Sequence, residues 1–336
     1  MGTLVSILIP AYNAEHLIAE TLGCALAQTW EDKEIIVVDD GSRDRTYEVA
    51  HRFASGRVKV VRQDNTGAPG ARNRALSLAQ GDYIQWLDAD DLLHPEKISR
   101  QMARAQDARN DRLLWTCAWG KFFFRTHKAQ FEPDALWQDL SPVEWILARF
   151  EHNVWMNPAV WLVSRRLTES AGPWDVRLAS SGDDDGEYIC RVAASSEGVR
   201  FVPDAHCYYR IGTVGSLNWN METSEKPLVS LLLSLRLSLD HLLHLEDSPR
   251  ARAAALQHLR TFSGYFYSAP ERFFEQLQAI ARTLGGQVEP PSVGWKYYPF
   301  ERALGEKATM ALIRNWRASK LRTRRNLDLC LSRFGI

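Results

Sequence analysis

The sequence LDADD at residues 87–91 places three carboxylates directly after DYIQWL at residues 82–87, an apolar run that predicts a buried strand. The acids therefore gather where the strand leaves the core, and their like charges repel one another unless a cation sits among them. Oxygen ligands with no His or Cys beside them favour Mg²⁺ or Mn²⁺ over zinc, commonly shared with the phosphates of a nucleotide. The other interpretation is a solvated acidic turn ahead of a helix that starts near Pro95.

Three earlier segments repeat this order of apolar strand, polar loop and helical pattern. The strands are VSILIP at 5–10, EIIVV at 34–38 and VKVV at 58–61, and the loops after them are AYN, DDGS and NTGAPG. Buried strands that alternate with helices imply a mainly parallel sheet with right-handed crossovers. All the loops after the strands then lie at one edge, where such sheets bind their ligands. We therefore expect an α/β fold with a nucleotide site at that edge.

The four segments together resemble the signature of the family 2 inverting glycosyltransferases of the GT-A fold. The match runs from about Val5 to about Leu93, with weaker similarity to about Tyr209. The resemblance implies a Rossmann-like, mainly parallel sheet flanked by helices, and the transfer of a sugar from a nucleoside-diphosphate sugar. We predict a catalytic domain at residues 1–216 and a helical C-terminal region at residues 217–336.

A nucleoside-diphosphate sugar needs partners for its base, its ribose and its diphosphate. Asp40 can accept the imide N–H of a base, which suits UDP or dTDP, and Tyr12 can offer a platform for the ring. Asp40 also suits a second, structural role, as an acid before a helix N-terminus. The matching motifs add Pro10 and Ala89 to the predicted donor site.

By resemblance, Asp90 is the metal ligand of the family's Asp-x-Asp motif, and Asp88 contacts the ribose and shares the metal site. We expect Asp91 to orient its neighbours or to cap the following turn. Arg72 has two interpretations: it reaches the phosphate or the base, or it is a surface charge on its helix.

A transferase also needs a base for the acceptor hydroxyl, and SGDDDGE at residues 181–187 precedes an amphipathic helix. In the related enzymes the Asp of a Glu-Asp or Gly-Asp pair is the base and stands six residues before an Arg, so that counting back from Arg191 gives Asp185. Here the pair is two acids and Gly186 replaces the usual aromatic, which leaves Asp184 as an alternative. A neighbouring carboxylate would raise the pKa of the base towards its working range. Alternatively, the acids simply favour the first turn of a helix.

Two later segments are less distinctive. WMNPAVWLV at residues 155–163 resembles the strand that lines the acceptor side in such enzymes, and its Trp side chains either stack on sugars or belong to the core. YYR at residues 208–210 resembles the family's Tyr-Arg run, but IGT follows it where many relatives carry a His. We therefore expect no His ligand for the metal at this point.

The composition favours a cytoplasmic protein. The 336 residues include 41 basic and 41 acidic side chains, so nucleic acid is not implied. The five Cys are scattered without a CxxC pair, which indicates neither a disulfide framework nor a zinc site. The N-terminus passes directly into the first strand, so we expect no signal peptide, and the apolar run from Leu228 to Leu239 is too short to span a membrane.

The C-terminal region has a helical pattern and ends in a basic, partly amphipathic stretch at residues 310–325. That stretch is either a solvated tail or a contact with an acidic partner or an anionic membrane surface, which would put the protein at the inner face of the cytoplasmic membrane. The acceptor is expected to be a glycan or a lipid-linked sugar.

Two other classes of protein share parts of this pattern. A sugar nucleotidyltransferase would carry a Gly-rich, basic loop after its first strand, and residues 10–15 have neither feature. A non-catalytic sugar-nucleotide-binding protein would keep Asp40 and Asp90 but lose the base, whereas Asp184 and Asp185 are present. We therefore predict a metal-dependent inverting transferase in which Asp185 activates the acceptor hydroxyl.

Overall fold

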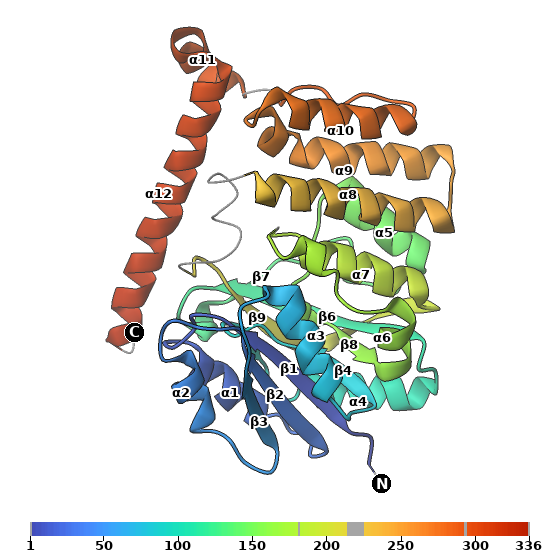
Figure 1. The fold of residues 1–336 in the computed structure, drawn as a ribbon, viewed down its shortest axis with the longest axis vertical. Helices are drawn as coiled ribbons and strands as arrows, with labels where there is room; N and C mark the ends of the chain where they lie inside the picture. The colour runs from blue at the N-terminus through green and yellow to red at the C-terminus, as the bar shows by residue number, and fades with distance from the viewer. Residues whose placement is uncertain (1, 181, 214–224, 292–293, 335–336) are drawn as a thin grey trace.

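The structure is a computed structural model that describes residues 2–180, 182–213, 225–291 and 294–334. In these residues a nine-stranded sheet with flanking helices carries a stack of helices on one side (Figure 1). The sheet order is β3-β2-β1-β4-β8-β6-β9-β5, and β7 pairs with β6.

The first four long strands are parallel, as predicted. They are β1 (Val5–Ala11), β2 (Lys33–Asp39), β3 (Val58–Arg62) and β4 (Tyr83–Trp86). The helices between them are α1 (Ile18–Leu26), α2 (Thr46–His51) and α3 (Ala68–Leu78). Every residue of β1 is buried, and α3 packs against β1 and β2, which explains why these strands lack an apolar–polar alternation. The loops after the four strands therefore meet at one edge of the sheet.

The second half of the sheet contains both strand directions. Its strands are β5 (Leu92–Leu93), β6 (Leu113–Phe122), β7 (Gln130–Phe131), β8 (Leu162–Ser164) and β9 (Gly198–Arg210). Its helices are α4 (Lys97–Ala108), α5 (Pro142–His152), α6 (Arg165–Ala171) and α7 (Asp184–Ser195). Strand β8 is antiparallel to β4 and β6, whereas β6 and β9 are parallel. The sheet is thus parallel from β3 to β4 and mixed over its full width.

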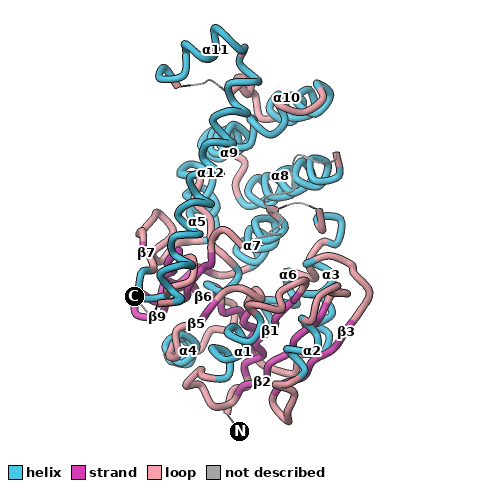
Figure 2. Tube along the Cα trace, turned by 90° about the vertical axis from the view of Figure 1, so that its left-hand side faces the viewer, coloured by secondary structure: helices cyan, strands magenta, loops and turns pink. Residues whose placement is uncertain are grey.

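The predicted helical C-terminal region is present. It consists of α8 (Lys226–Leu245), α9 (Pro249–Tyr267), α10 (Glu271–Thr283), α11 (Tyr298–Leu304) and α12 (Glu306–Arg333). Helices α8, α9 and α10 stack in layers beside α7 and α5, while α12 runs back along the stack and ends near β7 and β9 (Figures 1 and 2). The predicted domain boundary at residues 216 and 217 lies outside the described residues.

Helix α8 is longer than the apolar run in the sequence. Among the described residues it is the one helix whose length and composition would allow it to cross a membrane. Its side with Leu231, Leu235 and Leu239 is buried, and it contacts α7 and α9. We therefore interpret α8 as a core helix of the stack.

Candidate active site

Arg72 joins the two acidic segments of the sequence. It lies in α3 and is only 5% exposed, so it is not a surface charge. Its Nη2 donates to Asp88 Oδ1 at 2.8 Å, and its Nη1 donates to Asp184 Oδ2 at 2.6 Å. The guanidinium also lies 4.3 Å from the ring centre of Trp174, a cation–π contact. The strand-end acids and the acids of α7, far apart in the chain, therefore meet at one buried cation.

Asp90 and Asp91 follow Asp88 but have different surroundings. Burial, and then the charge of Asp88, raises the pKa of Asp90 to about 6. Asp91 is fully buried, and its Oδ1 accepts from the backbone N–H of Arg210 at 2.8 Å. Asp91 thus ties the acidic loop to the end of β9, which agrees with the orienting role expected for it.

The acids at residues 88 and 90 fit a hard divalent cation. Both are carboxylates at the end of a parallel strand, and the raised pKa of Asp90 shows that its ionised form is poorly compensated by the protein alone. Within the described ranges, no three His, Cys, Asp or Glu side chains gather into a metal site. A Mg²⁺ or Mn²⁺ ion bound here would therefore take further ligands from phosphate or water, as these ions usually do.

The predicted base-reading residue Asp40 holds a loop. Its Oδ1 accepts from the backbone N–H of Thr66 at 2.9 Å and from Gln63 Nε2 at 2.7 Å, and its Oδ2 accepts from the N–H of Gly67 at 2.8 Å. Gly67 has a φ of +82°, which favours glycine, and α3 begins after it. Since a carboxylate oxygen has two lone pairs, Oδ2 keeps one for a ligand. The structural role of Asp40 thus concerns the loop before α3, and not the N-terminus of α2 that the sequence suggested.

The other predicted donor residues differ in accessibility. Tyr12 follows β1 and is 46% exposed, so its ring is available to a ligand. Pro10 is buried within β1, opposite Val38 of β2. Ala89 is nearly buried, and its carbonyl accepts from the Thr21 hydroxyl at 3.0 Å. Of these three, Tyr12 offers a ligand the most side-chain surface.

The three acids at the start of α7 are held differently. Asp183 accepts from Arg149 at 3.3 Å and from the Ser234 hydroxyl at 2.8 Å, and Asp184 accepts from Arg72. No side chain or backbone group of the described residues donates a hydrogen bond to the half-buried Asp185. Burial, and then the charges of its two acidic neighbours, raises the pKa of Asp185 well above its ordinary value. Among the three acids, Asp185 is therefore the one whose carboxylate accepts no hydrogen bond from the described part of the chain and whose raised pKa suits a base.

Gly186, where the family pattern predicted an aromatic residue, lies against two charged side chains. A Cβ at this position would overlap Asp183 Oδ1 and Arg149 Nη2. These two side chains form an ion pair across 3.3 Å, with Arg149 coming from α5. A side chain at position 186 would therefore have to displace this ion pair.

Arg210 is a site residue to which the sequence assigned no role. Its Nε donates to the Asp90 carbonyl at 2.8 Å, its Nη1 donates to the Phe123 carbonyl at 2.9 Å, and its Nη2 lies 2.7 Å from Glu20 Oε2. The Tyr-Arg run was the available signal, but nothing local in it shows which loops the guanidinium would reach. Arg210 positions the backbone of the acidic loop.

Residues 6–131 match the model of the glycosyl transferase family 2. This part of the chain resembles the family 2 glycosyltransferases. The match covers the parallel half of the sheet and the acidic loop, where the sequence motifs lie.

Curated relatives are similar to this chain over the same part. An uncharacterized glycosyltransferase of Rickettsia typhi is 35% identical over 132 residues, which are 39% of this chain and 41% of the relative. The Escherichia coli UDP-Glc:alpha-D-GlcNAc-diphosphoundecaprenol beta-1,3-glucosyltransferase WfaP is 43% identical over 100 residues, which are 30% of this chain and 40% of WfaP. The chain thus spans about two fifths of the length of these relatives.

Solved structures resemble this chain over most of its length. S. aureus TarS 1-349 in complex with UDP-GlcNAc has a TM-score of 0.65 at 18% identity, covering 83% of both chains. The mannosyltransferase PcManGT of Pyrobaculum calidifontis, in complex with GDP-Man and Mn2+, has a TM-score of 0.53 at 17% identity, covering 97% of this chain and 84% of PcManGT. These similarities confirm the predicted GT-A fold.

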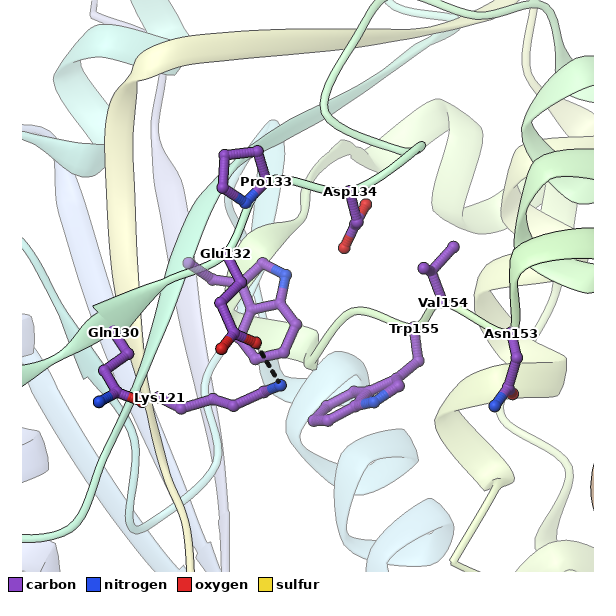
Figure 3. A pocket seen from close by; sticks show the side chains of 9 residues that line it. Lys121, Gln130, Glu132, Pro133, Asp134, Asn153, Val154 and Trp155 are labelled. Carbon is purple, nitrogen blue, oxygen red and sulfur yellow. Dashed lines mark hydrogen bonds and ion pairs between the residues drawn. The ribbon is translucent and has the colours of Figure 1, made fainter. Parts of the chain in front are cut away.

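Trp155, Trp161 and Trp174 differ in accessibility. Trp161 and Trp174 are buried in the core, and Trp174 stacks on Tyr188 with ring centres 3.8 Å apart. Trp155 is 39% exposed and lines a cavity of about 250 Å³ (Figure 3). Of the two interpretations of the Trp-rich segment, the core one holds for Trp161, while Trp155 is available to a ligand.

Proposed function

We propose that the chain is a metal-dependent inverting glycosyltransferase that moves a sugar from a UDP- or dTDP-type donor to a hydroxyl of a glycan or lipid-linked acceptor. The observation that carries the proposal is the Arg72 bridge, which brings the strand-end acid Asp88 and the helix acid Asp184 to one cation. A donor bound at the strand ends would then lie beside the candidate base, the next residue along α7.

The donor half of the proposal assigns roles at the strand ends. Tyr12 stacks on the base, and Asp40 accepts the imide N–H through its remaining lone pair on Oδ2. Asp90 and Asp88 hold a Mg²⁺ or Mn²⁺ ion, which supplies positive charge to the diphosphate leaving group. The solved complexes of TarS with UDP-GlcNAc and of PcManGT with GDP-Man and Mn2+ support a nucleotide-sugar site in this fold.

The acceptor half assigns the chemistry to Asp185. Its free carboxylate takes the proton of the acceptor hydroxyl while the oxygen attacks the anomeric carbon and the bond to the diphosphate breaks. One displacement from the face opposite the leaving group inverts the configuration. Asp184 holds Arg72 and, by its charge, raises the pKa of Asp185.

Helix α12 supports a lipid-linked acceptor. Its sequence contains eight Lys or Arg and two acids, and one of the acids, Asp328, pairs with Arg125 at 2.7 Å. Leu312, Trp316 and Leu327 are exposed and recur at helical spacing, which forms an apolar stripe among cations. We propose that this stripe rests on the anionic inner surface of the cytoplasmic membrane. The lipid-diphosphate acceptor in the name of WfaP agrees with such a location.

A thermal-shift panel of nucleoside diphosphates and their sugars, with and without Mn²⁺, tests the donor half. A ligand at 100 times its Kd stabilises the fold by about 2.7 kcal/mol, and we expect this gain for UDP or dTDP compounds only when Mn²⁺ is present. Release of free nucleoside diphosphate from the stabilising donor separates an enzyme from a sugar-nucleotide-binding protein. Stabilisation without any release, with or without acceptors, would favour the binding protein.

A further inference from the structure

A cavity of about 250 Å³ lies beside the candidate active site. Its wall comes from β6, the β7 hairpin and the segment after α5, and includes Trp119, Lys121, Glu132, Asp134 and Trp155. Figure 3 shows the labelled side chains around one open space, with the Asp134 carboxylate above the Trp155 indole. The cavity thus combines aromatic surface with charged groups that can form hydrogen bonds.

The aromatic surface is held rigidly. The Trp155 ring centre lies 4.8 Å from that of Trp119 and 5.0 Å from that of Tyr209, which meets it edge-on. Trp155 nevertheless remains 39% exposed. An indole that is fixed by two aromatic neighbours and still accessible is a suitable platform for the C–H face of a sugar ring, since little side-chain entropy is lost on binding.

The charged side chains of the cavity determine which class of sugar it can bind. Lys121 Nζ lies 3.4 Å from Glu132 Oε2, so its positive charge is already paired. Asp134 Oδ1 accepts from the backbone N–H of Leu136 at 2.8 Å, which leaves Oδ2 for a ligand. With two carboxylates against one ammonium group, the cavity would repel a phosphate or a uronate but can accept hydrogen bonds from neutral hydroxyls.

Tyr209 connects the cavity to the catalytic side. Its ring contacts both Trp119, with centres 6.0 Å apart, and Trp155. The next residue of β9, Arg210, donates from its Nε to the Asp90 carbonyl at 2.8 Å. The cavity wall is therefore connected through β9 to the acidic loop of the candidate active site.

We propose that this cavity binds an uncharged pyranose of the acceptor glycan, with Trp155 stacking on the ring and Glu132 and Asp134 accepting its hydroxyls. The assignment as an acceptor subsite rests on the proposed function. The subsite would select a neutral sugar residue and would exclude the phosphate end of a lipid-linked acceptor.

Saturation-transfer NMR of the full chain with neutral di- and trisaccharides, and with the corresponding uronates and sugar phosphates, tests the inference. We expect saturation of neutral sugars, and a loss of affinity of about tenfold or more in Trp155→Ala, with a smaller loss in Trp155→Tyr. Glu132→Gln provides a second variant on an exposed side chain, whose removal does not threaten the fold, and we expect it to weaken binding severalfold. Tyr265→Ala, an equally exposed aromatic on α9, is the matched control and should bind as the unmodified chain does.

Release of nucleoside diphosphate from the donor in the absence of acceptor is measured in parallel. A chain that binds neutral sugars through Trp155 but neither binds nor cleaves a donor would refute the proposed function and leave a sugar-binding cavity. The inference is overturned if donor cleavage is present while neutral sugars fail to bind, if charged sugars bind as well as neutral ones, or if the Trp155 and Glu132 variants bind like the control.

Discussion

Arg72 Nη1 lies 2.6 Å from Asp184 Oδ2, and this buried ion pair fastens the helix that carries the candidate base to the helix after the donor loop. The same guanidinium reaches Asp88, so one side chain positions acids of both halves of the site. Asp184 is thereby occupied, and Asp185 is left as the free carboxylate.

Removal of this cation should destabilise the protein. In Arg72→Met, Asp184 becomes a buried carboxylate without its partner, which typically costs about 3–5 kcal/mol. We expect urea unfolding to show a loss of this order. Arg74→Met, at an exposed position of the same helix, is the control and should change little. Equal stability of the two variants would mean that the ion pair does not hold the site together.

Turnover measurements should distinguish between the two candidate bases, Asp185 and Asp184. Asp185→Asn should leave donor and metal affinity nearly unchanged and lower turnover by about 10²–10⁴, as removal of a general base does. Asp184→Asn should lower turnover less, but should also lower stability, because it weakens the contact with Arg72. The reversed ranking of turnover would assign the base to Asp184, and full activity in both variants would exclude the cluster from the mechanism.

Asp90 should be required for metal-dependent nucleotide binding. Asp90→Asn should abolish Mn²⁺-dependent nucleotide binding in calorimetry, since it removes a charged ligand from the strand end. The fold should persist, because the pKa of Asp90 is raised to about 6 and a neutral side chain suits its surroundings. Asp240→Asn, an exposed acid on α8, is the control. Unchanged metal-dependent affinity in the folded Asp90 variant would remove the residue from the metal site.

His258 should make the stability fall in acid. It is buried in α9, stacks on Phe150 with ring centres 4.0 Å apart, and neither of its nitrogens has a hydrogen-bond partner among the described residues. Burial, together with the positive charge of Arg149, lowers its pKa well below 6.5. Below about pH 6.5, His258 is therefore protonated in the unfolded chain but not in the folded chain. Its contribution to the free energy of unfolding is complete above this pH and falls by about 1.4 kcal/mol per pH unit below it.

Denaturant unfolding of His258→Phe between pH 5 and pH 7 tests this dependence. The variant should lose the contribution of this one group to the slope. His16→Gln changes a His whose side chain is 84% exposed and should keep the slope of the unmodified chain. A slope that is the same in all three proteins would show that His258 does not resist protonation.

The stripe on α12 should carry membrane binding. Co-sedimentation with vesicles that contain phosphatidylglycerol should be strong at low salt and fade as salt rises, since each cation near the surface adds roughly 1 kcal/mol. Replacement of Leu312 and Trp316 by Ser should reduce binding by about tenfold or more. Val229→Ser, an exposed apolar residue on α8, is the control. Equal pelleting of all three proteins would exclude the stripe as the anchor.

The fold was predictable because its signals are local. Each strand of the parallel half is a short apolar run, and each is followed by a loop whose residues suit a turn or a helix start. The second half of the sheet was harder to predict from the sequence, because β5 and β7 have two residues each and such short strands show no periodicity. The length of α8 exceeded its apolar run because the helix continues through Asp240 and His241 to the buried Leu242 and ends at Leu245.

The sequence by itself determined where the loops after the first parallel strands would meet, because the carboxyl ends of parallel strands lie at one edge of the sheet. Only the tertiary structure decided what each side chain does there. Arg72 binds Asp184, and Arg149 forms an ion pair beside Gly186. The sequence does not predict these contacts, because each joins residues that are distant in the chain. Such partners depend on how helices pack, and packing leaves no local pattern in the sequence.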